Sequence, residues 1–190
     1  MRSLSLPLLL CAAGLITACR KDTAPPKPKA DAIRVDACTL LSKQEIEAVQ
    51  KSPITDTKTS EQAAGDFRMA QCFYTAAEFN RSINLAVIQK DASHTQTRTP
   101  KQFWDETFVR AAEKKDKDEK EAGEEKERRT PPKKIDGVGD DAYWVPNRFG
   151  GVLYVLKDDT FISISVGGPD PEQTKIDKSK ALAQKAIRRL

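Results

Sequence analysis

Hydrophobic and polar residues alternate along several short segments of the chain, which is the pattern of β-strands with one buried face. The clearest case is the segment around Ile162, Ile164 and Val166, where Ser163 and Ser165 occupy the intervening positions. We expect six strands, at 54–60, 67–75, 82–90, 142–145, 152–156 and 161–166. The first alternates only weakly and is predicted to be an edge strand.

Three helices are predicted from capping residues at their starts. Ser42 and Glu45 form a capping box that starts a first helix, and this helix is expected to end before Pro53. Thr99-Pro100 is expected to start a second helix. A third helix is expected to begin with Asp170 as its cap, Pro171 as its first residue and Gln173 closing the box. Its inner face is predicted to comprise Ile176, Leu182, Ala183, Ala186, Ile187 and Leu190.

The order of these elements, α-βββ-α-βββ-α, predicts an α+β domain in which helices flank an antiparallel β-sheet. We assign this single domain to residues 36–190. Within it, the segment 113–130 is an insert dense in alternating charges, predicted to be a solvated helical extension rather than a protein-docking helix.

The first residues have the pattern of a bacterial export signal. An apolar stretch from Leu4 to Ala18 is too short to span a membrane as a helix. The sequence Ile16-Thr17-Ala18-Cys19 resembles the lipobox of bacterial lipoprotein precursors, which implies a signal peptide at 1–18 and lipidation of Cys19. An ordinary secretory signal with an incidental cysteine is the alternative.

The resemblance to lipoprotein precursors implies a membrane anchor and an envelope location. Residues 19–35 would be a lipidated cysteine followed by a Pro- and Lys-rich tether. Arg20, directly after the lipobox, favours the outer membrane, on its periplasmic side or at the surface, over the inner membrane. Residues 31–190 carry 27 basic and 27 acidic side chains, and this neutrality argues against a nucleic-acid partner.

Cys38 and Cys72 are the two cysteines left after Cys11, in the signal, and the lipidated Cys19. In an exported domain such a pair favours a structural disulfide. A metal site lacks further ligands because His94 is the only histidine, and a redox pair is usually closer in sequence. We therefore expect a disulfide, no metal and no cofactor.

Three short motifs resemble uncharacterised bacterial lipoproteins best known from actinobacteria. They are Cys38-Thr39-Leu40-Leu41-Ser42 followed by Glu45, Cys72-Phe73-Tyr74, and the turn from Gly137 to Tyr143. That family is similar in architecture to PsbP-like domains, and it implies a sheet flanked by helices and supports the disulfide. It brings no catalytic residues to this chain.

The candidate binding residues form two sets, one of carboxylates with aromatic rings and one of aromatic rings alone. Asp140 and Asp141, with Tyr143 and Trp144, can bind sugars or cations, act as acid and base, or simply build a turn. Phe103 and Trp104, with Trp144, are candidate walls of an apolar cleft between the sheet and the second helix.

Three functions follow from these residues, in order of preference. The first is a non-catalytic envelope module that binds a protein or an envelope polymer. The second is a small-molecule or lipid binding module, and the third is an enzyme that uses Asp140 and Asp141.

Overall fold

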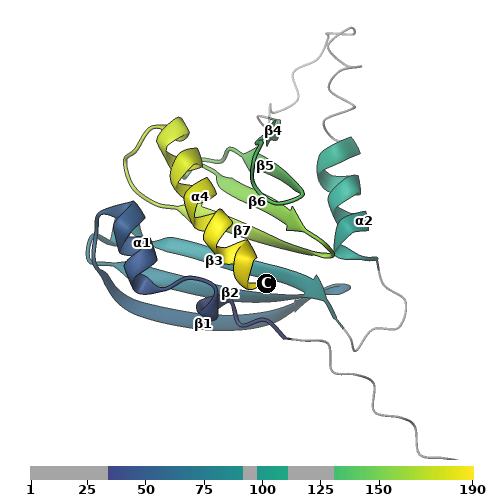
Figure 1. Ribbon diagram of the computed structural model, residues 1–190, viewed down its shortest axis with the longest axis horizontal. Coiled ribbons are helices and arrows are strands. Elements are labelled where there is room, and N and C mark those ends of the chain that lie inside the picture. The colour runs from purple at the N-terminus through teal and green to yellow at the C-terminus, as the bar shows by residue number, and fades with distance from the viewer. Residues whose placement is uncertain (1–33, 92–97, 111–130) are drawn as a thin grey trace, which may run out of the picture. The chain divides into compact units, whose positions relative to one another are not determined.

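The computed structural model describes residues 34–91, 98–110 and 131–190 (Figure 1). The chain divides into two compact units, Met1–Ala30 and Asp31–Leu190, and the described residues all belong to the second. The predicted signal peptide 1–18, Cys19, His94 and the whole of the charged insert 113–130 lie outside the described residues. Within the described ranges, no helix has the length and apolar character needed to cross a membrane.

Seven antiparallel strands form one sheet in the order β1-β2-β3-β7-β6-β5-β4. The α+β class and the antiparallel sheet are therefore confirmed, as is the position of β1 at an edge. The strands are β1 (Ile54–Ala64), β2 (Phe67–Ala76), β3 (Ile83–Lys90), β4 (Lys133–Lys134), β5 (Asp141–Val145), β6 (Val152–Lys157) and β7 (Thr160–Val166). Strand β4 has no signal in the sequence, because it is too short to alternate and is defined by its pairing with β5.

Two helices cover one face of the sheet, which we call the α1/α4 face: α1 (Lys43–Gln50) and α4 (Glu172–Ala186). Figure 1 shows both in front of the sheet. The predicted capping box of α1 is present, since Ser42 Oγ accepts from the Glu45 amide at 3.2 Å and the Glu45 carboxylate accepts from the Ser42 amide at 3.0 Å. The core beneath is fully buried and includes Leu40, Ile46, Tyr74, Leu85, Trp144, Ile164 and Leu182.

The start and end of α4 differ from the prediction. Pro171, not Asp170, is the residue that precedes the helix, and it makes no side-chain cap. The Asp170 carboxylate instead accepts from Lys178 Nζ at 2.6 Å, one turn or more into the helix, so an ion pair has replaced the expected cap. Leu190, predicted to be buried, is 38% exposed, because the chain ends in a 3-10 turn after α4.

Among the described residues, the opposite face carries helix α2, and we call it the α2 face. Helix α2 (Pro100–Trp104) begins at the predicted Thr99 and continues as a π-helical turn, Asp105–Val109. Its aromatic side chains pack on the sheet, and Trp104 lies 4.5 Å from Phe108 between ring centroids. This second core comprises Phe67, Ala86, Ile88, Trp104, Phe108, Tyr143, Leu156 and Phe161.

The predicted pair Cys38–Cys72 forms a disulfide with its Cα atoms 5.0 Å apart. It joins the short 3-10 helix before α1 (Ala37–Thr39) to strand β2. Cys72 is fully buried on the α1/α4 face and Cys38 is partly buried against the same core, so the bond lies at the edge of the core.

Candidate binding site

The α2 face of the sheet changes from apolar to polar along the strands, and α2 covers only the apolar end. Strand register aligns residues into rows that cross the sheet. Beneath α2, one row comprises Met69, Ile88, Phe161 and Leu156. Four residues further along β2, the row reads Phe73, Asn84 and Ser165. Because α2 buries apolar side chains, it packs on the first row, and the second row remains half-exposed.

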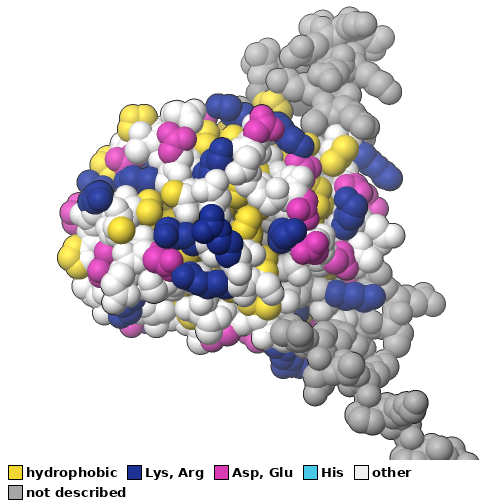
Figure 2. All heavy atoms as spheres, in the orientation of Figure 1, with side chains coloured by type: hydrophobic (Ala, Val, Ile, Leu, Met, Phe, Trp, Pro, Cys, Tyr) yellow, Lys and Arg dark blue, Asp and Glu magenta, His cyan; other side chains and the backbone are white. Residues whose placement is uncertain are grey.

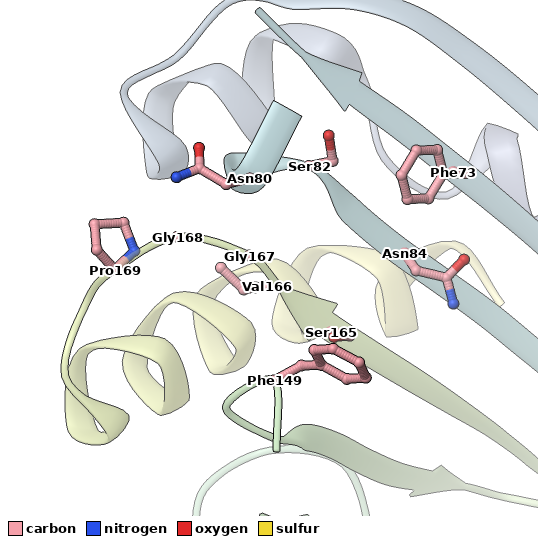
Figure 3. A pocket seen from close by; sticks show the side chains of 10 residues that line it. All are labelled: Phe73, Asn80, Ser82, Asn84, Phe149, Ser165, Val166, Gly167, Gly168 and Pro169. Carbon is pink, nitrogen blue, oxygen red and sulfur yellow. The ribbon is translucent and has the colours of Figure 1, made fainter. Parts of the chain in front are cut away.

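A hollow of about 420 Å³ lies on this second row (Figure 3). That volume falls in the range typical of small-molecule sites. The hollow is lined by Phe73, Asn80, Ser82, Asn84, Phe149, Ser165, Val166, Gly167, Gly168 and Pro169. None of these ten residues carries a charge, so its chemistry is that of aromatic rings, side-chain amides and hydroxyls.

One exposed phenylalanine, Phe149, lines the hollow, and a second, Phe79, packs against the lining residue Phe73. Phe149 is 73% exposed and Phe79 is 71% exposed, the largest values among the big apolar side chains of the described residues. The Phe149 ring lies beside Ser165 in Figure 3, and Phe79 packs against Phe73 with ring centroids 6.3 Å apart. Exposed aromatic residues that gather at one place are a mark of binding surfaces.

Glycines let two loops approach the sheet closely at the ends of the hollow. A Cβ at Gly167 would collide with the backbone oxygen of Asn80, and a Cβ at Gly151 would collide with the Trp144 ring. Gly151 also has a φ of +146°, a conformation that favours glycine. The two loops are thus fixed by close packing, which sets the shape of the hollow.

The polar side chains of the hollow have unused hydrogen-bonding capacity. The amides of Asn80 and Asn84 make no side-chain hydrogen bond within the described part of the chain. Ser165 Oγ makes a single long bond of 3.5 Å to the Gly151 carbonyl. An amide offers both donors and acceptors, so the row presents several groups to a ligand.

The α1/α4 side of the molecule shows many Lys and Arg side chains over its centre (Figure 2). Several of those on α4 and its C-terminal turn are engaged by the protein itself. Lys178 pairs with Asp170, and both Lys185 and Arg189 pair with Glu45. The Arg189 guanidinium, followed by the amide and hydroxyl of Ser42, lowers the pKa of Glu45 to about 2. We therefore locate the candidate site on the α2 face.

Asp140 and Asp141, the first predicted candidates, occupy different structural positions. One carboxylate oxygen of Asp140 accepts from the Asp158 amide at 2.7 Å and the other from Lys157 Nζ at 3.2 Å. The bond from the Asp158 amide is the main reason that the pKa of Asp140 is lowered. Asp140 thereby closes the β6–β7 turn.

Asp141 connects α2 to the sheet edge. Its carboxylate accepts from Trp104 Nε1 at 3.0 Å, from the Ala142 amide at 2.8 Å, and from Lys134 of β4. The ion pair raises the pKa of Lys134. Among the described residues, no group of three or more His, Cys, Asp or Glu side chains is placed to hold a metal ion.

The predicted aromatic walls do not face one cleft. Trp104 belongs to the core of the α2 face and Trp144 to the core of the α1/α4 face, so the sheet separates them. Phe103 stacks on Phe161 with ring centroids 5.9 Å apart, and Tyr143 stacks on Phe108 at 5.4 Å. These side chains fill the space between α2 and the sheet.

Phe73, Asn84, Phe149 and Ser165 were not among the predicted binding residues. One signal was available, since Phe161, Ser163 and Ser165 share a face that becomes polar along β7. The partners across the sheet depend on register and are not visible in the sequence.

Comparisons of the chain with protein-family models, with curated proteins and with solved structures found no match.

Proposed function

We propose that this chain is a lipid-anchored lipoprotein of the bacterial cell envelope whose PsbP-like α+β domain is a non-catalytic binding module. The binding surface is the hollow on the α2 face. One observation carries the proposal: a row of half-exposed polar and aromatic side chains, bordered by Phe79 and Phe149, remains uncovered in a domain that otherwise buries its apolar residues.

The two carboxylates support a binding role over catalysis. Asp140 and Asp141 each accept hydrogen bonds from structural partners in the turn, the strand or α2. Neither residue lines the hollow. A general acid or base needs access to a substrate proton. A substrate bound in the hollow would not lie next to the Asp140 or Asp141 carboxylate, because neither residue lines it.

The anchoring part of the proposal rests on the lipobox-like sequence ending at Cys19. In the producing bacterium, metabolic labelling with an alkyne fatty acid tests it. The wild-type chain and Cys11→Ser should both be labelled, whereas Cys19→Ser should lose the label and leave the membrane fraction. Labelling of Cys19→Ser at the wild-type level would refute lipidation at this residue.

The binding part is tested by photo-crosslinking in intact cells. A benzophenone amino acid at position 149 should form discrete adducts, because Phe149 borders the hollow. The matched control is the same amino acid at position 188, an exposed residue in the turn after α4. Absence of adducts at position 149, or an equal adduct pattern at 188, would refute the hollow as the binding surface.

A further inference from the structure

We propose that the hollow binds an uncharged segment of a carbohydrate chain. This inference rests on the proposed function, since it names the class of ligand for the same surface. The observations that carry it are the neutral lining, the two free amides and the exposed ring of Phe149.

The alternation of rings and polar groups matches the chemistry of sugars. Phe73, Asn84 and Ser165 lie side by side on three neighbouring strands. A sugar ring has an apolar C–H face that packs on an aromatic ring and hydroxyls that donate and accept hydrogen bonds. One ligand of this class satisfies all three side chains.

A purely apolar ligand fits the hollow less well. It would bury the amides of Asn80 and Asn84 without a partner, and burial of an unpaired polar group is costly. A lipid chain also requires a deeper apolar enclosure, whereas part of this hollow is lined by the polar side chains of Asn84 and Ser165.

Two cations lie near the hollow without lining it. Arg81 pairs with Glu78 at 2.9 Å, and the Arg148 guanidinium lies 4.7 Å from the centroid of the Phe149 ring. Since no charged side chain lines the hollow itself, we expect an uncharged ligand to be preferred over an anionic one.

Isothermal titration of the full chain tests this inference. The chain is kept in a polyoxyethylene detergent, because glucoside and maltoside detergents carry sugar headgroups. The probes are two neutral trisaccharides, triacetylchitotriose and maltotriose, and the anionic trigalacturonate. We expect at least one neutral trisaccharide to bind at millimolar concentration or below, and more tightly than trigalacturonate.

Variants locate the binding. Phe149→Ala should weaken it about five- to tenfold through loss of ring stacking, and Asn84→Ala about three- to tenfold through loss of a hydrogen bond. The matched controls are Leu190→Ala, an exposed apolar side chain on the other side, and Gln62→Ala, an exposed amide on β1. Both controls should bind as the wild type does, and unchanged urea midpoints show that all four variants are folded.

Three results overturn the inference: no binding of either neutral trisaccharide, tighter binding of trigalacturonate, or binding that Phe149→Ala and Asn84→Ala leave unchanged. The crosslinking experiment separates this failure from failure of the proposed function. If position 149 still forms specific adducts in cells, the hollow is a binding surface for another class of ligand. If it forms none, both proposals fail.

Discussion

Replacing Asp141 with alanine removes the acceptor that holds α2 to the sheet. The indole N–H of Trp104 donates to this carboxylate at 3.0 Å, and Trp104 is fully buried. Without Asp141, the N–H of this buried indole loses the acceptor that the structure gives it. We therefore expect Asp141→Ala to destabilise the domain and loosen α2.

The expected magnitude follows from the burial of each partner. An unsatisfied buried donor costs about 1–3 kcal/mol. The pair with Lys134 adds about 0–1 kcal/mol, since the Lys134 side chain is 54% exposed. Together these give a loss of about 1–4 kcal/mol in the free energy of unfolding. In a domain of this size, that lowers Tm by roughly 2–16 °C.

The matched control is Asp140→Ala, the neighbouring carboxylate. Its side chain is 46% exposed, against 16% for Asp141, and its main partner is the exposed Asp158 amide at 2.7 Å. Because water replaces this bond, we expect a loss of about 0.5–1.5 kcal/mol. Urea unfolding followed by tryptophan fluorescence measures both variants.

A double-mutant cycle isolates the Trp104 contact. In a Trp104→Phe background no indole N–H remains, so Asp141→Ala should cost less there than in the wild type, by about 1 kcal/mol or more. Equal costs of Asp141→Ala in the two backgrounds, or equal losses for Asp140→Ala and Asp141→Ala in the wild type, would refute this account of Asp141.

Three further predictions concern stability. Replacing both Cys38 and Cys72 with serine should lower the free energy of unfolding by about 3–4 kcal/mol, seen as a lower urea midpoint that dithiothreitol no longer changes. Glu45 has its pKa lowered to about 2, from 4.5; its contribution is therefore complete above about pH 4.5 and is lost as the pH falls towards 2. Urea midpoints measured across that window should fall less steeply for Glu45→Gln than for the wild type. Gly167→Ala should cost about 1–3 kcal/mol by thermal unfolding, because its Cβ collides with backbone oxygens of Asn80 and Ser82, and a Tm equal to that of the wild type would contradict this packing.

Elements with local signals could be predicted from the sequence. The capping boxes at Ser42 and Thr99 specify where α1 and α2 begin, because donor and acceptor lie three residues apart. The alternation of apolar and polar residues located six strands, because it too is a signal contained within one short segment. The start of α4 was misplaced because Asp170 binds Lys178, eight residues away, and the sequence holds no signal that favours this pair over a cap.

The candidate site depends on relations between distant segments. Alternation places Tyr143 and Trp144 on opposite faces of β5, but which face α2 covers is decided by packing. The hollow requires Phe73, Asn84 and Ser165 to be in register across three strands. It also requires the Phe149 loop to approach β7 from a separate hairpin. None of these relations is encoded within one short segment.

The disulfide also determines how the domain responds to mechanical load. Residues that precede Cys38 are linked covalently to the sheet at the bond between Cys38 and Cys72, and Cys72 lies in β2, which is hydrogen-bonded to β1 and β3 along its length. A pull from the N-terminal side is therefore carried into the sheet by a covalent bond. Helix α1 begins after that point and is shielded from the tension, so it should remain folded under a force that detaches it from the reduced protein.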